Sequence, residues 1–218
     1  MTTANKKLFL AIAILIIGSA WLLARQIITA RSITIKTVNM PLVSPVAIDL
    51  PITPADPLLG NPGAPLTIVI FGDLADASTR SLLSTTINFI GDHLTAVRLI
   101  FKPTLSQRLL GSSSLAHQAL WCVSSSNQQF WALLKNLLDS PNLTEDQLKA
   151  RADKLRLNGA QLLTCAKLPA TEQAVINTGT ALRDLGIATS PAFFANNKQV
   201  NMESGVNIEQ MLTTFTQE

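Results

Sequence analysis

The chain has 218 residues, of which 47% are apolar and 14% are charged, and its formal net charge at pH 7 is +3. This apolar content excludes a disordered chain, and the length allows one domain with some additional chain. Lys and Arg form no basic stripe, and two Cys with two His cannot build a zinc-finger or iron–sulfur framework. We therefore expect no nucleic-acid partner, no metal and no cofactor.

The N-terminus carries the strongest local signal. Lys6 and Lys7 precede an unbroken apolar run over residues 8–24, from Leu8 to Ala24. As a helix this run would be about 25 Å long, just enough to cross a thin inner membrane. Because basic residues mark the cytoplasmic side, residues 1–7 are expected to form a cytoplasmic tail and residues 8–24 a transmembrane anchor in the lipid bilayer. This predicts a single-pass protein of a bacterial inner membrane, with its C-terminal domain in the periplasm.

A cleaved signal peptide is the alternative interpretation of the same run. Gly18-Ser19-Ala20 supplies the small residues of a cleavage site. The apolar run nevertheless continues past this site through Trp21, an aromatic residue that suits the membrane interface, and this favours the anchor. In both interpretations most of the chain is exported.

A proline-rich segment follows over residues 25–65. Seven of the eleven prolines lie between Pro41 and Pro65. This spacing forbids a helix and interrupts a sheet, so it predicts an extended, semi-rigid exported spacer, with a disordered tether as the alternative. Part of the segment is apolar enough to dock on a partner, namely Leu42, Val43, Val46, Ile48, Leu50 and Ile52.

From Leu66 onward the pattern changes to alternating strands and helices. It predicts a strand over 66–71, a helix over 77–92 and a second strand over 96–101. A helical block over about 113–168 contains a capping box formed by Thr144 and Gln147. The pattern then predicts a helix over about 171–185, strands over 192–195 and 199–202 joined by a hairpin turn, and a last helix over about 207–215. This order matches the thioredoxin fold, an α/β fold. The predicted domain covers residues 66–218, and its helical insertion covers about 113–168.

Several strings along this domain resemble the DsbA-like family of exported thiol–disulfide oxidoreductases. The resemblance covers about residues 56–218, and it implies a thioredoxin fold with a cis-proline at Pro191. The strings are Asp56–Pro65 before the first strand, Phe71-Gly72-Asp73-Leu74 at its end, Phe130-Trp131 eight residues after Cys122, Cys165 after Leu162-Leu163, and Gly186–Phe194 around Pro191.

The chain departs from this family at its chemical centre. After Phe71-Gly-Asp-Leu-Ala the family places Cys-x-x-Cys at a helix start, where this chain has Asp76, Ala77, Ser78 and Thr79. The family's mechanism needs a thiolate at the helix N-terminus, and neither Asp76 nor Thr79 supplies one. We therefore expect a degenerate member that lacks the motif and has no catalytic residues.

Two other roles for these residues can be compared. Asp76 is expected at or near the N-cap of the helix, where a carboxylate satisfies free backbone N–H groups. A hydrolytic Ser78 would need a histidine and an oriented partner. His93 and His117 lie in separate segments, with no sequence reason to converge on Ser78. The structural role of Asp76 is favoured.

Cys122 and Cys165 lie in two helices of the insert, 43 residues apart. An even pair of cysteines in an exported chain predicts a structural disulfide, and the resemblance supports this pairing. Two buried reduced thiols are the alternative. A redox-active pair is disfavoured, because no charge beside Cys122 stabilises a thiolate.

The loop around Pro191 suggests a binding function without redox chemistry. A cis Ser190–Pro191 bond would expose the Ser190 backbone beside the degenerate motif, and in thioredoxin-like proteins such a groove pairs with an extended peptide. The predicted peptide-binding groove consists of Asp76, Ser78, Thr79, Ser190 and Pro191.

The predicted function is that of a non-catalytic binding or scaffold subunit. Its protein partners would lie in the periplasm or inner membrane, within an assembly of the secretion, conjugation or respiratory type. The alternatives are a periplasmic chaperone or holdase, a thiol–disulfide oxidoreductase auxiliary that uses Cys122 and Cys165, and a degenerate paralogue without activity.

Overall fold

The computed structural model describes residues 43–105, 112–187, 190–202 and 207–217. The expected tail and anchor over 1–24 therefore lie outside the described residues. Within the part of the chain that is described, no helix is long and apolar enough to cross a membrane.

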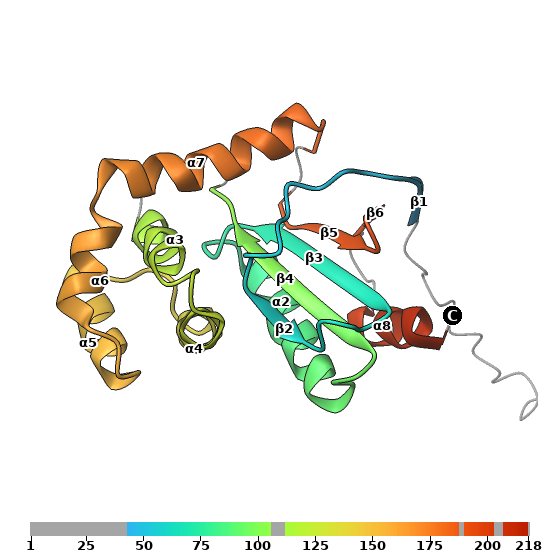
Figure 1. Cartoon of the computed structure of the whole chain (residues 1–218), viewed down its shortest axis with the longest axis horizontal. Helices are drawn as coiled ribbons and strands as arrows, with labels where there is room; N and C mark the ends of the chain where they lie inside the picture. The colour runs from blue at the N-terminus through green and yellow to red at the C-terminus, as the bar shows by residue number, and fades with distance from the viewer. Residues whose placement is uncertain (1–42, 106–111, 188–189, 203–206, 218) are drawn as a thin grey trace, which may run out of the picture. The chain divides into compact units, whose positions relative to one another are not determined.

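A six-stranded mixed sheet forms the centre of the domain, in the order β1-β6-β5-β3-β4-β2 (Figure 1). The parallel strands β3 (Leu66–Gly72) and β4 (Val97–Pro103) are connected through α2 (Ala77–Asp92). β5 (Ala192–Ala195) runs antiparallel to β3 and forms a hairpin with β6 (Lys198–Val200), and α8 (Ile208–Gln217) follows. This is the β-α-β and β-β-α order expected of a thioredoxin fold.

Strand β3 is buried along its whole length because both faces of the sheet are covered. Leu66, Ile68 and Ile70 point into the larger apolar cluster, which contains residues of α2, α8 and the helical insert. Val69 and Phe71 point the other way, into a smaller cluster. The continuous apolar run that predicted this strand therefore reflects burial on two sides.

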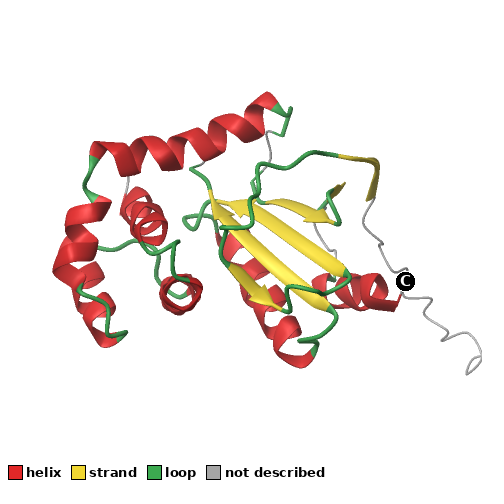
Figure 2. Cartoon of the chain, in the orientation of Figure 1, coloured by secondary structure: helices red, strands yellow, loops and turns green. Residues whose placement is uncertain are grey.

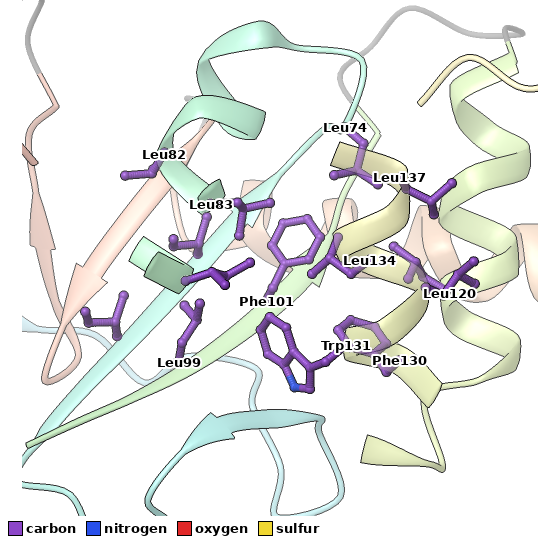
Figure 3. Packing of buried hydrophobic residues seen from close by; sticks show 14 of the residues in the cluster. Leu74, Leu82, Leu83, Leu99, Phe101, Leu120, Phe130, Trp131, Leu134 and Leu137 are labelled. Carbon is purple, nitrogen blue, oxygen red and sulfur yellow. The ribbon is translucent and has the colours of Figure 1, made fainter. Parts of the chain in front are cut away.

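The helical insert follows β4 (Figure 2). It consists of α3 (Ser112–Cys122), α4 (Asn127–Leu138), α5 (Glu145–Lys154) and α6 (Gly159–Ala166), and α7 (Pro169–Asp184) leads back to the sheet. The predicted capping box starts α5: Thr144 Oγ1 accepts from the Gln147 N–H at 3.3 Å, and Gln147 Oε1 accepts from the Thr144 N–H at 3.0 Å. Aromatic and leucine side chains of α4 pack beside Phe101 of β4, which joins insert and sheet in one core (Figure 3).

The proline-rich segment is part of the sheet from Val43 onward. β1 (Val43–Ala47) pairs with β6 at one edge of the sheet, and β2 (Leu58–Gly60) pairs with β4 at the other edge. Between the two strands, Leu50 is 4% exposed and belongs to the smaller apolar cluster. The prediction of an extended spacer is therefore wrong over residues 43–65. The predicted domain start at Leu66 is wrong for the same reason.

The position of the prolines explains why they do not prevent this pairing. Edge strands and bulges tolerate proline, because a missing N–H there breaks no ladder on a second side. Pro45 lies in β1, where the register with β6 shifts between Val43 and Ala47. The apolar side chains Ile48, Leu50 and Ile52, for which the sequence suggested a separate partner, pack on their own domain.

Candidate functional site

The turn between β3 and α2 presents the residues at the degenerate motif. Asp73 is 2% exposed, and its Oδ1 accepts from the Ala75 N–H at 2.8 Å. Arg80 of α2 holds the other end of the turn, because its guanidinium donates to Leu74 O at 2.8 Å and to Ala75 O at 2.9 Å. The turn is therefore held by side chains from both of its ends.

Asp76 is the N-cap residue of α2, as expected, but its carboxylate makes no capping hydrogen bond. The expectation that it satisfies the first-turn N–H groups is wrong, because the carboxylate has another donor. Ser190 Oγ donates to Asp76 Oδ2 at 3.1 Å, and the Asp73 N–H donates to Ser190 Oγ at 3.3 Å. Ser190 thus ties the loop before β5 to the turn before α2.

Two further residues of the predicted groove differ in exposure. Ser78 is exposed, whereas Thr79 is fully buried. A Cβ atom built on Gly72 would lie 2.6 Å from Thr79 Cγ2, so Thr79 packs directly on the end of β3. Thr79 is therefore inaccessible and cannot contact a peptide, which corrects its predicted role.

The peptide bond between Ser190 and Pro191 is cis, as the sequence led us to expect. Ser190 is exposed, and Asp76 and Pro191 are partly exposed. Together with Ser78, these residues form the accessible part of the predicted groove. This surface offers a ligand the carboxylate of Asp76, the hydroxyl groups of Ser78 and Ser190, and backbone polar groups.

His117 is the residue of this site that sequence reasoning missed. It comes from α3 of the insert, and its ring is fully buried. The Leu74 N–H donates to His117 Nε2 at 3.0 Å, and Asp73 Oδ1 lies 3.5 Å from the same nitrogen. No signal in the sequence placed this histidine near the turn before α2, where its partners are Leu74 and Asp73 rather than Ser78. Because the ring is buried, it offers no base to a substrate at the surface.

The two cysteines form a disulfide, as predicted. Cys122 at the end of α3 bonds to Cys165 of α6, with the Cα atoms 6.1 Å apart. Thr171 Oγ1 lies 4.0 Å from the first sulfur and 3.9 Å from the second. Since the sequence contains only these two cysteines, the cross-link uses every thiol of the chain.

A concavity of about 190 Å³ lies beside the end of β4, with Trp121 and Phe130 in its lining. Its charged groups neutralise each other: Lys102 Nζ lies 3.1 Å from Asp56 Oδ1 and donates to Pro51 O at 2.7 Å. These contacts hold the loop before β2 on β4, so both charges already have structural partners.

No protein-family model and no curated protein matches this chain. Solved structures do. BdbD from Bacillus subtilis in its oxidised form is 19% identical, with a TM-score of 0.63 over 75% of this chain and 94% of that one. A periplasmic thioredoxin-like protein from Salmonella enterica serovar Typhimurium is 23% identical, with a TM-score of 0.61 over 78% of this chain and 94% of that one. DsbA2 from Pseudomonas aeruginosa is 19% identical, with a TM-score of 0.60 over 75% of this chain and 93% of that one.

These similarities agree with the order of elements and with the helical insert described above. The chain therefore has the thioredoxin-like fold with a helical insertion, and its structural homologues are DsbA-like thioredoxin-fold proteins. Its two cysteines are 43 residues apart and paired with each other, so they do not form a Cys-x-x-Cys motif.

Proposed function

We propose that this chain is an exported, membrane-tethered thioredoxin-fold protein that binds protein partners and performs no thiol–disulfide exchange. It would act as a binding or scaffold subunit of an inner-membrane or envelope-spanning assembly. The observation that carries this proposal is the occupation of the motif position: Asp76 is hydrogen-bonded to Ser190, and Thr79 is buried against Gly72.

The chemistry of these two residues supports a role without catalysis. Thiol–disulfide exchange requires a thiolate that attacks a disulfide sulfur and a second thiol that resolves the mixed disulfide. A carboxylate and a threonine hydroxyl perform neither step. The remaining candidates, Cys122 and Cys165, already form a disulfide that connects two helices of the insert.

The surface that remains suits an extended peptide. Backbone pairing supplies affinity without any particular side chain, and neighbouring polar groups select the sequence. Asp76, Ser78 and Ser190 provide one charged and two neutral hydrogen-bonding side chains at the groove. A partner segment with N–H or hydroxyl donors facing Asp76 would complement them.

The proposed location depends on two features of the chain. The apolar run over 8–24 would tether it to an inner membrane. The disulfide fits an oxidising compartment such as the periplasm, where such bonds persist. One structural neighbour is itself a periplasmic protein.

Photo-crosslinking in native membranes tests the binding role. A photoreactive residue is placed at Ser78 in the full chain, and a matched residue is placed at Ala150, which is exposed on α5 in the insert. We expect a discrete adduct with one partner from Ser78 and none from Ala150. Many weak adducts with unfolded clients would instead support the holdase, and equal adducts from both positions would contradict the groove.

A redox assay tests the other half of the proposal. We expect the wild-type chain to show no insulin reduction or dithiol oxidation above buffer. Asp76→Cys with Thr79→Cys, which restores the motif, serves as the positive control for the assay. Wild-type activity that disappears in a folded Cys122→Ala, Cys165→Ala variant would overturn the proposal in favour of the oxidoreductase auxiliary.

A further inference from the structure

A hydrogen-bonded path connects the helical insert with the groove. It begins at the buried ring of His117 on α3, which accepts from the Leu74 N–H through Nε2 at 3.0 Å. The neighbouring Asp73 N–H donates to Ser190 Oγ at 3.3 Å, and Ser190 Oγ donates to Asp76 Oδ2 at 3.1 Å. Three hydrogen bonds, together with the backbone between Leu74 and Asp73, therefore connect the buried imidazole to the Asp76 carboxylate at the groove.

The acceptor role of Nε2 fixes the protonation state of this ring. A nitrogen that accepts from a backbone N–H carries no proton, so His117 is neutral, with its proton on Nδ1. Protonation places a second donor opposite the Leu74 N–H, and that hydrogen bond is lost. The new Nε2–H faces Asp73 Oδ1, 3.5 Å away, which is its available acceptor.

This change of partner would reach the whole turn. Asp73 Oδ1 also accepts from the Ala75 N–H at 2.8 Å, the bond that shapes the turn before α2. A charged imidazole drawn toward Asp73 would compete for that oxygen while leaving the Leu74 N–H without its acceptor. The two protonation states of His117 therefore favour different hydrogen bonds in three consecutive residues.

Among the described residues, Asp73 is an ionic neighbour of the ring, with its Oδ1 3.5 Å from Nε2. Arg80 on α2 contacts the same turn, where its guanidinium binds Leu74 O and Ala75 O. On the other helices packed against α3, the charged side chains are exposed, and α6 carries none. Those exposed groups are Lys135 on α4 and Glu172, Arg183 and Asp184 on α7.

We propose that His117 is a proton-dependent switch, which sets the conformation of the turn at 73–76 and thereby the contact between Asp76 and Ser190 at the groove. In the neutral state His117 holds Leu74, and the groove has the geometry described above. In the protonated state His117 pairs with Asp73, and the turn rearranges. Histidine suits this role because its ordinary titration range lies near neutral pH. The proposal concerns the chain alone and holds whether or not a partner binds.

An NMR titration of the full chain in detergent micelles tests this proposal. The sequence contains only two histidines, and His93 stacks on Phe89 with ring centroids 4.1 Å apart, so the two rings have different surroundings and their signals can be assigned separately. The pH is lowered from about 8 to about 4.5, a range that brackets an ordinary imidazole. The ring ¹⁵N signals report which nitrogen carries the proton, and the amide signals of Leu74, Asp76 and Ser190 report the path.

We expect these three amide signals to shift with the same midpoint as His117. That shared midpoint should be lost in His117→Gln and kept in His93→Gln. Amides that stay fixed while His117 titrates would overturn the proposal, and so would a His117 ring that remains neutral until the chain unfolds. The wild-type titration decides the question by itself if His117→Gln does not fold.

Discussion

Removing the disulfide gives the most quantitative prediction from this structure. Cys122→Ala with Cys165→Ala opens a cross-link between α3 and α6 that spans 43 residues. In the chain-entropy model, a loop of this length lowers the entropy of the unfolded chain by about 13 cal/mol/K, or about 4 kcal/mol at 25 °C. Because real cross-links often deliver less than this model gives, we expect a loss of about 2–4 kcal/mol in the free energy of unfolding.

Urea unfolding followed by tryptophan fluorescence measures this loss. Wild-type chain in dithiothreitol is the matched control, since the two cysteines of the disulfide are the only ones in the sequence. Reduced wild type and the double variant should unfold at the same urea concentration, and the reductant should not affect the variant. A loss below about 1 kcal/mol would refute the structural role of this bond.

Three further comparisons, each between two variants, test the packing described above. Leu50→Ala should cost about 2–4 kcal/mol in urea unfolding because Leu50 is 4% exposed, whereas Val46→Ala, at a residue 65% exposed, should cost almost nothing; equal effects would contradict the docking of this segment. Thr79→Val should stabilise the fold by about 1 kcal/mol, because the buried Thr79 hydroxyl has no hydrogen-bond partner among the described residues. Thr86→Val should not stabilise it, because the Thr86 hydroxyl donates to Leu82 O at 2.8 Å, and stabilisation by both changes would show that the partner is irrelevant. Gly72→Ala should cost about 1–3 kcal/mol by thermal or urea unfolding, and a second change, Thr79→Ala, should recover most of this loss because it removes the two closest atoms; no recovery would place the strain elsewhere.

The central elements of the fold were predictable because their signals are local. The apolar run before Gly72, the helical spacing over 77–92 and the capping box at Thr144 each depend on residues close together in the sequence. The edge strands were missed for the opposite reason. Pro45 argued against a strand, and only the pairing of β1 with β6, more than 150 residues away, shows that an irregular edge accommodates it.

The sequence predicted the position of the site but not all of its contacts. The order of motifs located Asp76 at the start of α2 and Pro191 in the loop beside it. The partner of the Asp76 carboxylate was not predictable, because Ser190 is 114 residues away and competes with the nearer backbone N–H groups. His117 was missed because only the packing of α3 on the sheet domain brings it to Leu74.

The arrangement of the N-terminal segment also has a mechanical consequence. Any force applied ahead of Val43 enters the domain at an edge strand, whose pairing with β6 is registered at Val43 with Val200 and at Ala47 with Lys198. The next points of resistance are the hydrogen bond from the Ile48 N–H to Asn197 O, the buried Leu50, and Lys102 Nζ on Pro51 O. Strand β1 would therefore detach from β6 first. The central strand β3 and the groove residues would keep their geometry while a force acts on the chain before Val43.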